Sequence, residues 1–202
     1  MSHKLLSSVL ERVPAEKLKG KKMIEVGSTR EMARDSTGHL FGFCKEREID
    51  FITVDMNPEQ ISRLQERFPD LNATTAKGEE FLEQFDGEIN FCYLDAFDYQ
   101  HGRHSQSRIS AYKKYLNTQI SNEACHQMHL RCAKALEERM PVGSIIVFDD
   151  VFGAYSDIEW DGKGKLAIPF LLENGFVPLT YTEEYYSKKT DAGGVALIRK
   201  ER

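Results

Sequence analysis

The chain has 202 residues, of which 41% are hydrophobic and 29% are charged, and its net charge is -5 at pH 7. This length allows a single domain with a sizeable core, and the composition excludes both wholesale disorder and a small disulfide-bonded scaffold. The first ten residues lack the apolar core of a signal peptide, and no apolar run approaches the roughly 20 residues of a membrane span. We therefore expect one soluble, cytoplasmic domain over residues 1–202, with a helical extension over 1–20 and no membrane partner.

The charges and the cysteines narrow the range of partners. The 27 basic and 32 acidic residues include no Lys/Arg-rich arm, which argues against nucleic acid as a partner. The four cysteines have no CxxC spacing, so we expect buried, reduced thiols in place of a zinc site. An amphipathic stretch over 5–13 is a candidate contact for a homodimer or a lid.

The predicted elements alternate between apolar strands and helical stretches. Strands are expected over 22–27, 51–55, 71–75, 89–95 and 144–149, and helices over 58–68, 78–85, 110–139 and 167–174. Near-continuously apolar strands separated by helices predict a parallel sheet that is covered on both faces. Two β-rich runs over 176–186 and 193–199 are joined by too few residues for a crossover helix, so they predict an antiparallel hairpin. The sequence thus predicts a doubly wound, Rossmann-like α/β fold with seven strands, mostly parallel, and one reversed strand near its end.

Acidic side chains stand at the carboxyl ends of the predicted strands, the edge at which open parallel sheets bind ligands. Asp55 ends the second strand, where a carboxylate can accept hydrogen bonds from both hydroxyls of a ribose. The alternative role of Asp55 is to cap the helix that begins near Pro58. The turn after the first strand has one glycine, Gly27, where dinucleotide-binding proteins use GxGxxG, so it is poorly suited to a diphosphate.

Three further carboxylates are expected to meet at this edge. If the fourth and fifth strands are neighbours about 4.8 Å apart, Asp95 lies beside Asp149 and Asp150. Three carboxylates in one small volume repel each other unless one is protonated or a cation neutralises them. Oxygen ligands suit Mg²⁺ better than zinc. The alternative is that Asp149 or Asp150 caps the next segment while Asp95 binds a loop.

The order of these motifs resembles that of class I S-adenosylmethionine (AdoMet)-dependent methyltransferases. The resemblance covers about residues 20–200 and is carried by Ile-Glu-Val-Gly (24–27), Val-Asp-Met (54–56), Ala-Lys-Gly-Glu-Glu (76–80) and Tyr-Leu-Asp-Ala (93–96). The C-terminal hairpin also matches the reversed strand of that fold. Within the family, Leu-Asp (94–95) followed by Val-Phe-Asp-Asp-Val (147–151) is similar to the metal-dependent O-methyltransferases of the catechol and antibiotic-sugar types.

The resemblance implies AdoMet as the cofactor. Glu25 and Gly27 would face its methionine part, Asp55 its ribose, and Gly78 with Glu79 its adenine. Because the first motif is poor in glycine, the hydroxyls of a Ser-Thr pair and the N-terminus of their helix are expected to bind the AdoMet carboxylate instead. The full cofactor-binding set that we expect is Glu25, Gly27, Ser28, Ser36, Thr37, Asp55, Met56, Gly78, Glu79 and Asp95.

The resemblance also implies a chemistry. Asp95, Asp149 and Asp150 would hold a divalent ion, Mg²⁺, that grips the hydroxyl oxygen of the acceptor. Methyl transfer is an in-line displacement, so the acceptor must be positioned and its proton removed. Asp98 is the first candidate for the catalytic base and His101 the second. The expected activity is metal-assisted O-methylation of a small molecule or sugar.

Two segments are candidates for contact with the substrate. The stretch 100–114 contains four Lys or Arg residues, two histidines and no acid, so it is expected to bind an anionic or glycosylated substrate. The stretch 152–165 contains the only tryptophan, Trp160, and its glycines Gly162 and Gly164 predict a mobile lid.

Three alternatives stay open at this point. A metal-independent methyltransferase would keep the AdoMet site and use Asp149 and Asp150 as structural caps. A non-catalytic subunit of the same fold would fit the glycine-poor first motif. A NAD(P)-dependent reductase shares the acid at the second strand but needs a glycine-rich turn that this chain lacks.

Overall fold

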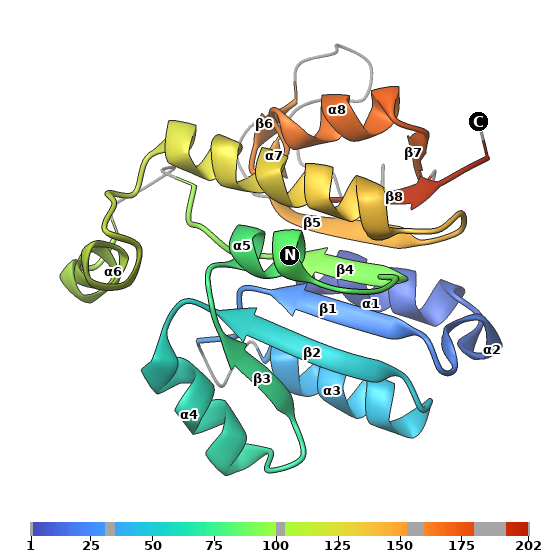
Figure 1. Cartoon of the computed structure of the whole chain (residues 1–202), viewed down its shortest axis with the longest axis horizontal. Coiled ribbons are helices and arrows are strands. Elements are labelled where there is room, and N and C mark those ends of the chain that lie inside the picture. The colour runs from blue at the N-terminus through green and yellow to red at the C-terminus, as the bar shows by residue number, and fades with distance from the viewer. Residues whose placement is uncertain (1, 31–34, 100–103, 153–159, 180–192, 202) are drawn as a thin grey trace.

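One mixed sheet with helices on both faces forms the molecule, as the computed structural model shows for residues 2–30, 35–99, 104–152, 160–179 and 193–201 (Figure 1). The strand order is β3-β2-β1-β4-β5-β8-β7, and a short strand, β6, pairs with β5 outside this path. The strands are β1 (Lys22–Val26), β2 (Asp50–Asp55), β3 (Asn72–Thr75), β4 (Phe91–Leu94), β5 (Ile145–Phe152), β6 (Asp161–Gly162), β7 (Phe176–Pro178) and β8 (Gly193–Arg199).

The sheet confirms the predicted doubly wound topology. Strands β1 to β5 pair in parallel along the path, while β8 is antiparallel to both β5 and β7. Seven strands follow the path and the two-residue β6 is an addition to the prediction. The chain winds outward from β1 in both directions, because β1 pairs with β2 on one side and β4 on the other. In sheets of this kind the ligand site lies at the carboxyl ends of the strands beside this switch point.

Two cores lie on opposite faces of the sheet because successive strand residues point to opposite sides. In β4, Phe91 and Tyr93 belong to one core, whereas Cys92 and Leu94 belong to the other. This double burial explains why the strands are almost continuously apolar. The helices are α1 (Ser2–Arg12), α2 (Ala15–Leu18), α3 (Ser36–Glu46), α4 (Pro58–Arg67), α5 (Gly78–Gln84), α6 (Gln106–Ala111), α7 (Asn122–Arg139) and α8 (Ala167–Glu173).

The helical tract expected over 110–139 is not one helix. Helix α6 continues into a π-helical turn, η2 (Tyr112–Leu116), and α7 begins only at Asn122. The break falls at Asn117, which adopts a left-handed conformation with φ 51°, and Ser121 then caps α7 by accepting a hydrogen bond from the Ala124 N–H. The periodicity correctly predicted helical residues, but the prediction of one continuous helix was wrong.

The amphipathic N-terminal stretch packs against the chain's own sheet. Leu5, Leu6, Val9 and Leu10 of α1 are buried in the core that includes Ile145. Helix α1 contacts β5 and β8. These four side chains are therefore used inside the fold, so they are not free for a dimer or lid contact, and a homodimer stays a prediction.

Two residues of the expected mobile lid form a short strand of the sheet. Residues 153–159 lie outside the described ranges, but Asp161–Gly162 forms β6 and pairs with β5. A Cβ atom at Gly164 would lie 2.4 Å from the Ile168 side chain, so the backbone there is tightly packed. The glycines of this segment allow close packing, and a lid role for residues 152–165 stays a prediction.

The described residues allow a comparison with two expectations, one about the cysteines and one about membrane-spanning helices. Cys44, Cys92, Cys125 and Cys132 are free and buried, which confirms the prediction of reduced thiols. Within the described ranges, no helix has both the length and the apolarity needed to cross a bilayer.

We predict opposite effects on stability for two glycine-to-alanine changes. Gly27 has φ 94°, and an added Cβ would lie 2.6 Å from the Ala96 nitrogen, so Gly27→Ala is expected to lower the free energy of unfolding by more than about 2 kcal/mol. Gly42, inside α3, has open space around it, so Gly42→Ala is expected to raise stability by about 0.5–1 kcal/mol. Urea denaturation measures both, and equal effects would contradict the assigned role of Gly27.

Candidate functional site

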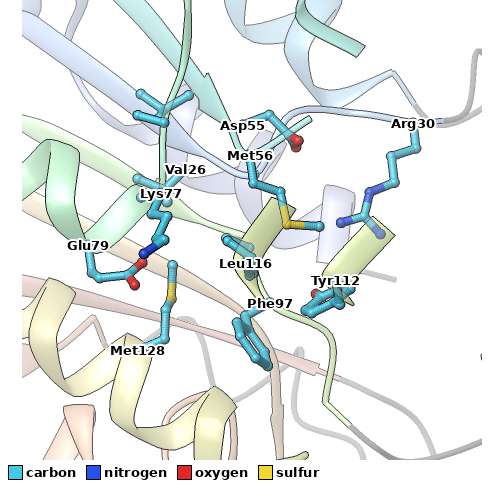
Figure 2. A pocket seen from close by; sticks show the side chains of 15 residues that line it. Val26, Arg30, Asp55, Met56, Lys77, Glu79, Phe97, Tyr112, Leu116 and Met128 are labelled. Carbon is cyan, nitrogen blue, oxygen red and sulfur yellow. The ribbon is translucent and has the colours of Figure 1, made fainter. Parts of the chain in front are cut away.

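A pocket opens at the carboxyl ends of β1 and β2, beside the switch point (Figure 2). Five residues of the expected cofactor set line it, namely Gly27, Asp55, Met56, Gly78 and Glu79. The other lining residues are Val26, Arg30, Val54, Ala76, Lys77, Ala96, Phe97, Tyr112, Leu116 and Met128.

Two glycines allow the backbone to pack closely around this pocket. Gly27 leaves β1 with a left-handed φ, and its missing side chain lets the chain after β4 pass at Ala96. At Gly78, the first residue of α5, a Cβ atom would lie 2.1 Å from the Val26 side chain. Helix α5 therefore begins directly beside the end of β1, which a larger residue at Gly78 would prevent.

Asp55 lies at the pocket with its carboxylate held by the backbone. One oxygen accepts a hydrogen bond from the Ser28 N–H at 3.1 Å and the other from the Asn57 N–H at 2.8 Å. Burial raises the pKa of Asp55, although the charge of Arg30 and these hydrogen bonds oppose that change. The side chain that caps α4 is Asn57, which accepts from the Glu59 N–H, so the alternative capping role of Asp55 is not needed. Each carboxylate oxygen keeps a lone pair for a ligand hydroxyl.

Glu25 lies inside the protein, bonded to three hydroxyl groups. It is fully buried, and its carboxylate accepts hydrogen bonds from Ser36 at 2.8 Å, Thr37 at 2.7 Å and Thr53 at 2.7 Å. The structure thus brings Glu25, Ser36 and Thr37 together, but the bonds join β1, β2 and α3, and none of these residues lines the pocket. Their contact with the cofactor stays a prediction. Burial raises the pKa of Glu25 to about 7, although the hydroxyls oppose this.

Asp95, Asp149 and Asp150 meet at the ends of β4 and β5, as predicted. A carboxylate oxygen from each lies within 4.8 Å of the others. Asp150 adopts φ 49° where the pairing of β5 with β8 shifts register, and this irregularity brings consecutive acids to the same place. We call these three residues the acid cluster. Asp149 accepts hydrogen bonds from the Asp150 N–H at 2.7 Å and the Tyr93 hydroxyl at 3.3 Å, and burial with the nearby charge of Asp95 raises its pKa well above the usual range.

The acid cluster contains a cation from the chain itself. The ammonium of Lys163, a side chain with an exposed fraction of 2%, lies 2.7 Å from Asp95 Oδ1 and 3.1 Å from Asp150 Oδ2. A divalent ion bound to these oxygens would lie close to that ammonium. At an effective dielectric constant of about 20, unit charges about 4 Å apart interact by about 4 kcal/mol, and a divalent ion doubles this repulsion. As arranged, the cluster therefore does not fit the expected Mg²⁺.

Asp98 forms ion pairs with two arginines. Its carboxylate lies 3.3 Å from Arg30 Nη1 and 3.2 Å from Arg108 Nε, and its backbone N–H donates to the Tyr112 hydroxyl at 2.6 Å. Burial disfavours the charged form, but Arg30, Arg108 and Lys163 outweigh burial and lower the pKa of Asp98. A low pKa makes a carboxylate a weak proton acceptor. The catalytic role of Asp98 stays a prediction, and His101 lies outside the described residues.

The stretch 100–114, expected to bind an anionic substrate, is partly neutralised by acids from other elements. Arg108 pairs with Asp98, and Lys114 pairs with Glu59 of α4 at 3.3 Å. Residues 100–103 lie outside the described ranges. The anionic-substrate role of this stretch stays a prediction.

Sequence reasoning assigned no cofactor contact to several residues of the pocket wall. Arg30 follows the glycine-poor turn, Tyr112 and Leu116 belong to η2, and Met128 belongs to α7. These elements are far apart in the sequence and meet only in the folded chain, as Figure 2 shows. Among these four residues, only Arg30 could have been predicted from the sequence as a cofactor contact, because it is the first cation after the expected cofactor turn.

Several solved structures with a similar fold are methyltransferases. The N-methyltransferase NodS of Bradyrhizobium japonicum superposes with a TM-score of 0.57 at 12% identity, over 98% of this chain and 97% of its own. SMU.1697c of Streptococcus mutans, described as a methyltransferase and bound to SAH, gives 0.59 at 11% identity over 98% of both chains. An rRNA methylase of Streptococcus thermophilus gives 0.56 at 13% identity, over 93% and 92%. The chain therefore has the fold of the class I AdoMet-dependent methyltransferases.

Comparisons of the amino-acid sequence do not assign the chain to a protein family. No protein-family model matches the chain, and no curated protein matches it. The finer resemblance to metal-dependent O-methyltransferases consequently stays a prediction from the motifs.

We predict that Glu25 makes stability depend on pH. The folded pKa of about 7 lies above the ordinary value of 4.5, so between these values the folded chain holds a proton that the unfolded chain has lost. Stability should therefore fall as the pH rises through this window, by about 3 kcal/mol at most. Denaturation of the wild type and Glu25→Gln from pH 4.5 to 7.5 measures the difference, with the exposed Glu11→Gln as control. An unchanged pH dependence in Glu25→Gln would show that Glu25 is ionised throughout.

Proposed function

We propose that the chain is an AdoMet-dependent methyltransferase that binds its cofactor in the pocket beside β1 and β2. The observation that carries the proposal is the position of Asp55, a buried carboxylate at the end of β2 that lines the pocket beside the switch point. The fold shared with known methyltransferases supports the same assignment.

The pocket offers a partner for each part of AdoMet. Asp55 would accept the ribose hydroxyls, and Gly78 with Glu79 would border the adenine, whose faces would contact the apolar side chains of Met56 and Met128. Arg30, which lines the pocket three residues after Gly27, would bind the methionine carboxylate.

The acceptor that we propose is a hydroxyl group of a small molecule or a sugar, in the cytoplasm. Its oxygen would approach the methyl carbon in line with the sulfur, form the new C–O bond as the C–S bond breaks, and leave S-adenosylhomocysteine. The hydroxyl proton must pass to a base, for which Asp98 and His101 remain the candidates. Asp95 and Asp150, whose side chains have exposed fractions of 29% and 25%, are available to accept a hydrogen bond from the acceptor.

Metal-assisted O-methylation with Mg²⁺ is the second candidate. It is favoured by the three carboxylate oxygens that lie within 4.8 Å of one another. It also requires Lys163 to leave Asp95 and Asp150, which the buried ion pairs oppose.

Cofactor binding tests the proposal directly. Isothermal titration with AdoMet and with S-adenosylhomocysteine is expected to show one site in the wild type. Asp55→Asn should raise the Kd for both about 10- to 100-fold, because a hydrogen bond to a charged group contributes about 1.5–3 kcal/mol. The matched control is Asp50→Asn, at the opposite end of the same strand, where the carboxylate pairs with Lys22 at 3.1 Å.

Two results would contradict this assignment. One is an absence of AdoMet binding by the folded wild type, which would favour a non-catalytic protein of the same fold. The other is an equal Kd for Asp55→Asn and Asp50→Asn. Thermal unfolding of each variant separates a lost ligand contact from a lost fold, since Asp55 also accepts two backbone hydrogen bonds.

A further inference from the structure

We propose that Lys163 is the resident cation of the acid cluster, a positioning residue that holds Asp95 and Asp150 where the similar O-methyltransferases would hold a divalent ion. Its significance for catalysis rests on the proposed function. The claim that the Lys163 ammonium excludes a divalent ion depends only on the geometry of the acid cluster, and it is tested without any substrate.

The ammonium of Lys163 is enclosed by the carboxylates that it binds. Its side chain has an exposed fraction of 2%, whereas those of Asp95 and Asp150 are 29% and 25% exposed. The lysine is thus much more buried than the two carboxylates that it binds. A buried ammonium needs paired acceptors, and the two contacts of 2.7 and 3.1 Å supply them.

Backbone contacts to β5 also position Lys163. Gly162, at φ 70°, pairs with Val151 of β5, and the Lys163 N–H donates to the Asp150 carbonyl at 3.0 Å. At Gly164 a Cβ atom would lie 3.2 Å from the Val151 side chain, so the segment packs closely against β5. Lys163 and Asp150 are therefore joined by both a backbone and a side-chain contact.

The neighbouring groups are consistent with a single resident cation. Burial and the charge of Lys163 lower the pKa of His129 to about 3, so this buried ring is neutral at pH 7. Asp149 is held by the Tyr93 hydroxyl and the Asp150 N–H, and its pKa is raised. The charge that a divalent ion would neutralise is thus already reduced by the ammonium of Lys163.

In the proposed reaction, the role of Lys163 is to fix the positions of Asp95 and Asp150. A carboxylate that is not held would move with each acceptor, whereas Asp95 and Asp150 are fixed by the same ammonium. The acceptor would then be oriented by hydrogen bonds to carboxylate oxygens, in place of bonds to a metal.

Titration with Mn²⁺ in the absence of AdoMet tests this proposal. The wild type is expected to bind no Mn²⁺ at the acid cluster, whereas Lys163→Met should create a site of three carboxylates with a Kd below about 1 mM, in the range of weak carboxylate sites. Lys163→Arg keeps the charge and should bind no Mn²⁺. Adding Asp150→Asn to Lys163→Met should weaken the new site at least about tenfold, because it removes a ligand.

Each outcome decides for or against the proposal. Mn²⁺ binding by the wild type that Asp150→Asn removes would overturn it and favour the metal-assisted candidate. Failure of folded Lys163→Met to gain a site would also overturn it. If Lys163→Met does not fold, Lys163→Gln takes its place, and if neither folds the comparison of the wild type with Asp150→Asn decides. A protein that binds no AdoMet but gains Mn²⁺ on loss of Lys163 would reject the proposed function and keep this inference.

Discussion

The close approach of β1 and β4 is the constraint on which the site depends. The chain winds outward from these two strands, so the segments that follow them diverge and leave a space at their carboxyl ends. Gly27 permits this approach, since any side chain there would overlap the backbone at Asp95 and Ala96. The pocket lies on the β2 side of this contact and the acid cluster on the β5 side. A methyl donor and a methyl acceptor would therefore meet across the same two strands.

Electrostatic balance distinguishes the two halves of this site. On the pocket side, Asp55 is bonded to backbone N–H groups and keeps acceptor capacity for a ligand. On the other side, Asp95, Asp149 and Asp150 would repel one another, and the chain provides a lysine among them. Burying an ion pair is costly unless its geometry is good and its remaining groups are bonded. The short contacts of Lys163 meet that condition within the fold itself.

The acids at the strand ends therefore have different roles, although they look alike in the sequence. Glu25 joins β1, β2 and α3 through three hydroxyl groups and has no exposed surface. Asp98 holds Arg30 beside the pocket and Arg108 of α6. A carboxylate at the ligand edge of a sheet can thus support the walls of a site without lining it, and only its partners distinguish these cases.

The sequence by itself determined the order of strands and helices, the parallel sheet with its reversed strand, and the gathering of Asp95, Asp149 and Asp150. These follow from local apolar patterns and from the rule that parallel strands end at one edge. Tertiary structure alone decided that Lys163 enters the acid cluster, that Tyr112 and Met128 line the pocket, and that α1 is part of the core. The physical reason is that a side chain's partners across β6, η2 and α7 depend on packing between distant segments, which no local pattern encodes.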